Sequence, residues 1–180
     1  MEIESKKIEP WIILLSGPTS SGKTTLAQAL QKRLSIPERP FLHVEADVLG
    51  VPNRPEHWDE GKEKRRFGRA FRRSVVAYLR EEYDIILDGI LPYGDSELLS
   101  DGLDLYRAHR LCYVGVRCSL RTLEERVSGR PDRDFDFARR QHRDIHEGQT
   151  YDVEIDTSEG NVDAGVEEIL AFLRRTDKIQ

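Results

Sequence analysis

The stretch from Trp11 to Leu30 constrains this chain more than any other. A β-rich apolar run is followed by Gly-Pro-Thr-Ser-Ser-Gly-Lys-Thr-Thr over residues 17–25, which matches the pattern G-x-x-x-x-G-K-[ST]. The residues after it place leucine and alanine at helical spacing, so a strand, a glycine loop and a helix follow in the required order. Glycines let successive backbone N–H groups point into one concavity that holds anionic oxygens. An ordinary strand-to-helix turn is the alternative.

This loop, of the Walker A kind, predicts an ATP site. Lys23 would contact the β- and γ-phosphates, and the Thr24 hydroxyl would be a ligand of Mg²⁺. The expected nucleotide-binding residues are Gly17, Pro18, Thr19, Ser20, Ser21, Gly22, Lys23, Thr24 and Thr25.

Length and charge narrow the class of protein. The 180 residues suit a single domain over 1–180, and the net charge of −5 argues against general binding to nucleic acid or to anionic membranes. The apolar runs are far shorter than the ~20 residues that a membrane span needs, and the charged start lacks the apolar core of a signal peptide. We therefore expect a cytoplasmic protein, and a homo-oligomer is compatible with the sequence.

Apolar segments of strand character alternate with helical patterns along the whole chain. Expected strands cover 11–15, 41–44, 83–87, 110–117 and 151–155, and expected helices after the first cover 61–82, 96–108, 120–128, 137–147 and 162–175. Such alternation predicts an α/β fold, with a mainly five-stranded parallel sheet covered by helices on both faces. The carboxyl ends of its strands share one rim. The glycine loop, Asp47, Asp88, the residues after Arg117, and Asp156 should therefore face a common cleft.

Two acidic residues follow expected strands. Asp47 could take the proton of an acceptor hydroxyl that attacks the γ-phosphorus, or it could cap a turn that starts at Val48; Glu45 is the competing carboxylate. Asp88 ends an apolar strand and could orient Mg²⁺, usually through water, or cap the next turn.

Arg126, Arg130 and Arg133 are spaced by four and three positions, which allows them to project from one side of a helix end and the adjoining turn. Guanidinium groups that fold over a transferring phosphoryl group stabilise its charge. Exposed ion pairing with nearby acidic residues is the alternative. The first interpretation predicts a lid at about 126–137.

The segment of about 48–75 is the expected substrate-binding region. Its first part is proline-broken loop, and long irregular loops often bind substrates. In the helix that follows, an inward face of Phe67, Phe71, either Ser74 or Val75, and Tyr78 is expected beside a basic stripe of Lys62, Arg66, Arg69 and Arg73. The stripe is either a solvated face or a site for an anionic acceptor.

The chain resembles the chloramphenicol phosphotransferase family of small P-loop kinases. The resemblance covers nearly the whole chain and rests mainly on Tyr113–Cys118, Arg126, Arg130-x-x-Arg133, His146-Glu-Gly148 and Tyr151–Thr157. It implies a fold similar to nucleoside and shikimate kinases, and ATP-dependent phosphorylation of a small-molecule hydroxyl. It also implies that Asp47 is the catalytic base, that Lys23 and Thr24 contact phosphate and magnesium, and that Arg126, Arg130 and Arg133 are lid arginines. The sequence departs from the family most over 48–71, where the acceptor should bind.

The sequence thus favours a Mg²⁺- and ATP-dependent small-molecule kinase. A nucleoside or nucleotide kinase, with Arg54 and the basic helix holding an acceptor phosphate, is a second interpretation. A nucleotide-dependent switch protein that phosphorylates no acceptor belongs to a different class. A 5′-hydroxyl polynucleotide kinase is disfavoured by the acidic net charge.

Overall fold

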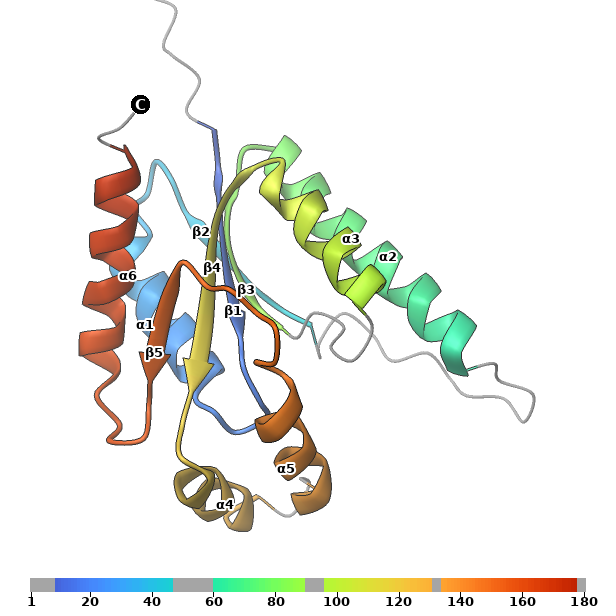
Figure 1. Cartoon of the computed structure of the whole chain (residues 1–180). Coiled ribbons are helices and arrows are strands. Elements are labelled where there is room, and N and C mark those ends of the chain that lie inside the picture. Colours follow the sequence, from blue (N-terminus) through green and yellow to red (C-terminus); the bar gives the residue numbers. More distant parts are fainter. Residues whose placement is uncertain (1–8, 47–59, 90–95, 131–133, 178–180) are drawn as a thin grey trace, which may run out of the picture.

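A five-stranded parallel sheet forms the centre of the molecule (Figure 1). The computed structural model describes residues 9–46, 60–89, 96–130 and 134–177. All four strand pairings are parallel and the strand order is β2-β3-β1-β4-β5, which confirms the predicted sheet. The strands are β1 (Trp11–Ser16), β2 (Phe41–Glu45), β3 (Asp84–Asp88), β4 (Arg110–Arg117) and β5 (Val153–Asp156).

Helices cover both faces of the sheet because β1 is apolar on both sides. Successive side chains of a strand point to opposite faces. Ile13 and Leu15 pack with α1 (Lys23–Leu34) and α6 (Val162–Asp177), whereas Ile12 and Leu14 pack with α2 (Glu60–Arg80) and α3 (Ser96–Arg107). The result is the expected arrangement of three layers, with α1 and α6 on one side and α2 and α3 on the other (Figure 1).

Two further helices lie beyond the carboxyl ends of the strands (Figure 1). These are α4 (Leu120–Ser128) and α5 (Phe135–Asp144), which share a small apolar cluster of their own. The Ser119 side chain caps α4 by accepting from the Thr122 N–H. The Asp134 carboxylate accepts from the Phe137 N–H and so starts α5 at Phe135, earlier than the sequence indicated.

The inward face of α2 differs from the prediction. Val75 is buried and Phe71 packs against the core as expected, but Phe67 and Tyr78 are exposed, and the other buried positions are Arg72, Val76 and Leu79. The buried stripe is rotated around the helix because α2 packs against α3 as well as the sheet. None of the helices within the described ranges is both long enough and apolar enough to cross a membrane.

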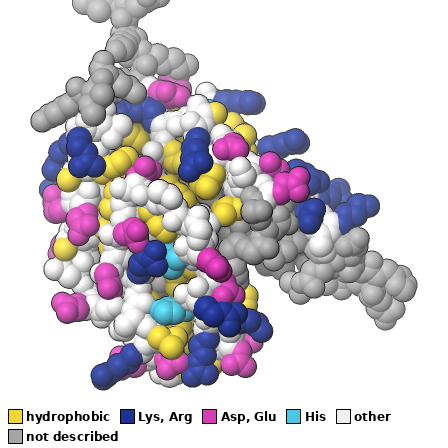
Figure 2. Space-filling view, viewed as in Figure 1, with side chains coloured by type: hydrophobic (Ala, Val, Ile, Leu, Met, Phe, Trp, Pro, Cys, Tyr) yellow, Lys and Arg dark blue, Asp and Glu magenta, His cyan; other side chains and the backbone are white. Residues whose placement is uncertain are grey.

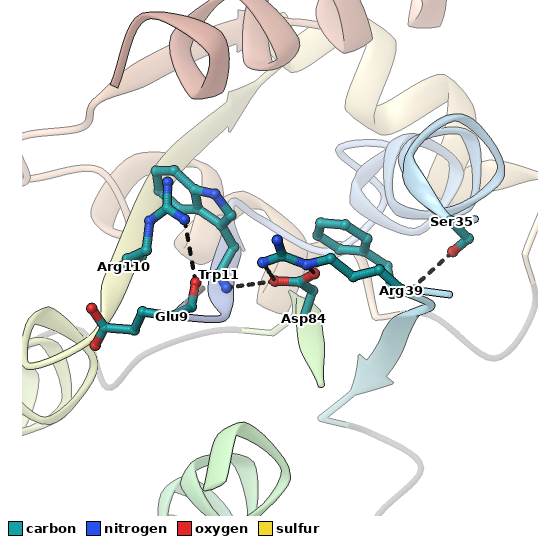
Figure 3. A network of polar contacts seen from close by, with 7 residues as sticks. Glu9, Trp11, Ser35, Arg39, Asp84 and Arg110 are labelled. Carbon is teal, nitrogen blue, oxygen red and sulfur yellow. Dashed lines mark hydrogen bonds and ion pairs between the residues drawn. The ribbon is translucent and has the colours of Figure 1, made fainter. Parts of the chain in front are cut away.

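A polar network lies at the amino end of the central strands (Figure 3). Asp84 begins β3, is fully buried, and accepts from the Trp11 N–H at 2.7 Å. Arg39 donates to both Asp84 carboxylate oxygens, one bond measuring 2.8 Å. The Arg110 guanidinium lies 4.2 Å from the centre of the Trp11 ring. This network joins β1, β3 and the loop before β2 at the edge opposite the glycine loop.

Candidate active site

The glycine loop follows β1 and is shaped by its two glycines. A Cβ on Gly17 would lie 2.3 Å from the Val116 carbonyl oxygen, so no larger residue fits beside β4. Gly22 has φ of +95°, in the left-handed region that glycine adopts without strain. These two positions let the chain turn sharply from the strand into α1.

The loop leaves polar groups available at the start of α1. Gly22 is the N-cap residue and contributes no side-chain cap, and the first turn holds no acidic residue. The hydroxyls of Ser20 and Ser21 are buried without a hydrogen-bond partner within the described ranges. Free N–H groups and the positive end of the helix dipole attract anions. The loop therefore fits a phosphate group.

Lys23 is nearly buried and folds back over the loop. Its Nζ donates to the carbonyl oxygens of Gly17 and Pro18, each at 2.8 Å. These contacts hold the ammonium group across the first half of the loop, where it adds a positive charge to the concavity.

The structure brings Thr24 and Asp88 together, as the common-cleft prediction requires. The Thr24 hydroxyl donates to Asp88 Oδ2 at 2.5 Å, and His43 Nε2 lies 3.9 Å from the same oxygen. Burial opposes ionisation of Asp88, but His43, the Thr24 hydrogen bond and the charge of Lys23 together lower the pKa of this carboxyl group. An ionised carboxylate beside a hydroxyl is an oxygen donor set that suits Mg²⁺.

Arg126 and Thr157 brace the other side of the loop. Arg126 Nη2 donates to the Thr157 carbonyl at 2.6 Å, and its Nη1 donates to Thr157 Oγ1 at 3.1 Å and to the Ser20 carbonyl at 3.4 Å. Thr157 Oγ1 in turn donates to the Ser21 carbonyl at 2.6 Å. The guanidinium group of Arg126 therefore lies against the glycine loop.

The other predicted residues are either exposed or outside the described ranges. Asp47 and Arg133 lie outside the described residues, and Arg130 is exposed just beyond α4, where its N–H donates to the Val127 carbonyl. Asp156 is exposed and accepts from the Ser158 N–H at 2.8 Å. Hydrogen bonds from Ser158 lower the pKa of Asp156. At the end of β5 it is Thr157, not Asp156, that contacts the glycine loop.

Three residues in contact with the site were missed from the sequence. Gln141 on α5 accepts from the Thr19 N–H at 2.7 Å, Thr157 holds the Ser21 carbonyl, and His43 on β2 faces Asp88. Each is a polar residue beside or within an apolar pattern. His43 in the middle of a short strand was the only one with a recognisable signal, since a polar residue there needs a partner.

A cavity of about 270 Å³ lies beside α5 at the carboxyl ends of β4 and β5. Its lining residues are Arg117, Cys118, Ser119, His142, His146 and Asp156. His142 Nε2 lies 2.9 Å from the Cys118 carbonyl oxygen, and His146 Nδ1 lies 2.8 Å from the Tyr151 hydroxyl. No group of three metal-ligating side chains occurs in the described part of the chain. The two histidines thus have contacts typical of structural residues.

The position of His146 makes the fold sensitive to acid. Burial, assisted by the charge of Arg117, lowers the pKa of His146 to about 4. The unfolded chain binds this proton near pH 6.5, so folding loses stability as the pH falls from 6.5 towards 4. We expect the free energy of unfolding to drop by up to about 3 kcal/mol more in the natural chain than in His146→Gln over this range. Urea unfolding at several pH values measures the difference, and an imidazole NMR titration midpoint near 6.5 would contradict it.

The arrangement defines a class of protein. Structures of similar fold include the Mycobacterium tuberculosis APS kinase in complex with AMPPNP and APS, with a TM-score of 0.71 at 13% identity, covering 93% of this chain and 99% of that one. A gluconokinase from Sinorhizobium meliloti 1021 matches with a TM-score of 0.62 at 19% identity, covering 94% and 95%. The Deinococcus radiodurans tunicamycin resistance protein matches with a TM-score of 0.62 at 19% identity, covering 91% and 95%. The fold is that of the P-loop kinases.

The sequence places the chain within one family of that class. The family model described as chloramphenicol phosphotransferase-like protein matches residues 10–174, and the chain belongs to this family. No curated protein matches it in sequence. Family and fold together support a nucleotide-dependent phosphotransferase.

Proposed function

We propose that this protein is an ATP- and Mg²⁺-dependent phosphotransferase that acts on a hydroxyl group of a small molecule in the cytoplasm, similar to a chloramphenicol phosphotransferase. The observation that carries the proposal is the contact between Thr24 and Asp88 at 2.5 Å, directly beside a glycine loop whose helix has no side-chain cap. This joins a phosphate site to an oxygen donor set for a metal ion. Thr24 would bind Mg²⁺ and Asp88 would orient it, and the ion would neutralise charge on the β- and γ-phosphates.

The remaining residues have separate roles in the proposed transfer. The acceptor oxygen attacks the γ-phosphorus as its proton passes to the Asp47 carboxylate, and the bond from the γ-phosphorus to the bridging oxygen breaks to leave ADP. Lys23 stabilises the β- and γ-phosphates from the loop. Arg126, Arg130 and Arg133 stabilise the charge of the transferring group, and Arg126 already lies against the Ser20 carbonyl.

A screen for acceptor-stimulated ADP release tests this function. The panel should contain chloramphenicol, other hydroxyl-bearing antibiotics, sugar acids, nucleosides and nucleotides, each with Mg²⁺ and ATP. We expect one chemical group to stimulate ADP release and to gain a phosphate by mass spectrometry. Slow hydrolysis that only a protein partner stimulates would contradict the proposal and favour a nucleotide-dependent switch.

The exposed cations of α2 support a second candidate, a nucleotide kinase or another kinase with an anionic acceptor. Cationic side chains follow the outer edge of the molecule on the α2 side (Figure 2). The exposed members are Lys62, Arg65, Arg66, Arg69 and Arg73. Arg72 is by contrast buried, with 6% of its surface exposed, and its charge acts on the buried Tyr106 hydroxyl.

Replacing Arg65, Arg66 and Arg69 together with glutamine tests the role of this surface. If the acceptor is anionic, its Michaelis constant should rise about tenfold or more because charge-assisted contacts are lost, while that of ATP should stay unchanged. Steady-state kinetics with the acceptor from the screen measures both constants. An unchanged Michaelis constant for the acceptor would indicate that the basic stripe is a solvated helix face.

A further inference from the structure

Gln141 is the one side chain of α5 in the described ranges that forms a hydrogen bond with the glycine loop. It lies 122 positions from Thr19 in the sequence, yet its Oε1 accepts from the Thr19 N–H at 2.7 Å. Only 3% of the Gln141 surface is exposed. A buried amide at this position needs hydrogen-bond partners, because an unpaired polar group in a protein interior is unfavourable.

The direction of the Gln141 amide follows from its partner. A backbone N–H can only donate, so the atom that faces Thr19 must be the oxygen, and the Nε2 group with its two donors faces elsewhere. No residue in the described part of the chain accepts a hydrogen bond from Gln141 Nε2. The nearby Ser20 and Ser21 hydroxyls also lack partners among those residues. The Gln141 amide and the two serine hydroxyls are thus hydrogen-bond donors located at the loop.

The contact lies next to the two carbonyl groups that hold the Lys23 ammonium group. Lys23 Nζ donates to the carbonyls of Gly17 and Pro18, the two residues just before Thr19. In loops of this pattern the lysine reaches the β- and γ-phosphates. A nucleotide bound in this way would have its γ-phosphate, rather than its α-phosphate, on the side of the Thr19 N–H and the Gln141 amide.

We propose that Gln141 binds the γ-phosphoryl group of the nucleotide through its amide N–H donors while its oxygen holds residue 19 of the glycine loop in place. The proposal rests on the proposed function. It explains why a neutral amide is buried against the loop: an amide can accept from a backbone N–H and donate to an anion at the same time, which a carboxylate cannot do. Gln141 would then distinguish ATP from ADP.

Calorimetric titration of the full chain with a non-hydrolysable ATP analogue and with ADP, both with Mg²⁺, tests the inference. In Gln141→Met, which has similar length but no hydrogen-bonding group, we expect the analogue to bind about tenfold more weakly, since a hydrogen bond to a charged group is lost, and ADP affinity to change less than about threefold. Gln141→Glu keeps the oxygen that faces Thr19 but adds a negative charge. Gln141→Glu should therefore weaken binding of the ATP analogue more than Gln141→Met does.

The matched control is Gln31→Met on α1, whose Nε2 donates to the Phe41 carbonyl at 2.9 Å, away from the loop. Its affinities for both ligands should equal those of the natural chain. Equal weakening of the analogue and ADP in both Gln141 variants, or no weakening in either, would overturn the inference. If the methionine variant fails to fold, the glutamate variant alone decides, because it preserves the contact with Thr19. Failure of the natural chain to bind either ligand would instead overturn the proposed function, and the inference with it.

Discussion

Replacement of Asp47 with asparagine is expected to remove most phosphoryl transfer and to leave ATP affinity unchanged. An amide cannot accept the proton of the attacking hydroxyl, and loss of a general base lowers a rate by roughly 10²–10⁴-fold. In the proposed function the phosphates contact the glycine loop and Lys23, which this substitution does not alter. Acceptor-dependent ADP release measures the transfer rate, and calorimetry measures the affinity for ATP.

Glu45 provides the matched control for this experiment. It is the last residue of β2, its carboxylate lies 3.8 Å from His43 Nδ1, and its side chain is 38% exposed. Glu45→Gln removes a carboxylate of the same neighbourhood and should retain nearly full transfer. Full activity in the Asp47 variant would refute its role as the base, and loss of transfer in the Glu45 variant alone would assign that role to Glu45.

Replacement of Asp84 with alanine should destabilise the fold more than any other single change to the described polar residues. Asp84 is fully buried and accepts from the Trp11 N–H and from the Nε and Nη2 groups of Arg39 (Figure 3). Its removal leaves a buried N–H and a partly buried cation without their acceptor. We expect a loss of about 3–5 kcal/mol in the free energy of unfolding, measured by urea denaturation.

Two further variants separate the causes of that loss. Asp84→Asn keeps an acceptor for the Trp11 N–H but removes the charge that faces Arg39, so it should cost less than the alanine variant. Glu154→Gln breaks an exposed pair with Arg117 and should cost less than about 1 kcal/mol, because solvent screens such pairs. A loss in the alanine variant no larger than that of Glu154→Gln would show that the network contributes little.

The fold was predictable to a large extent because its signals are local. Apolar runs ended by turns predict strands, and their alternation with helical patterns leads to the parallel sheet. The errors are informative. The Asp134 cap moved the start of α5, and packing against α3 turned Phe67 and Tyr78 outward while Arg72 turned inward. Periodicity predicts that a helix has a buried face, whereas packing against the neighbouring elements determines which residues lie on that face.

The arrangement of the site was predictable only where a local sequence pattern marks its residues. Lys23 and Thr24 belong to one short motif. Asp88 ends an apolar strand, and the carboxyl ends of parallel strands share one edge of the sheet, so the sequence placed Asp88 in the same cleft as Thr24, where the two side chains form a hydrogen bond. Gln141 and Thr157 carry no comparable pattern. Their contacts with the loop depend on how α5 and the end of β5 pack against it.

By itself, the sequence determined that a glycine loop lies between a strand and a helix, in a conformation that suits a phosphate group, because that property depends on the backbone over a few adjacent residues. Only the tertiary structure decided which side chains surround the loop. Arg126, Gln141 and Thr157 come from three separate elements, and their hydrogen bonds form only when these elements pack at the carboxyl edge of the sheet.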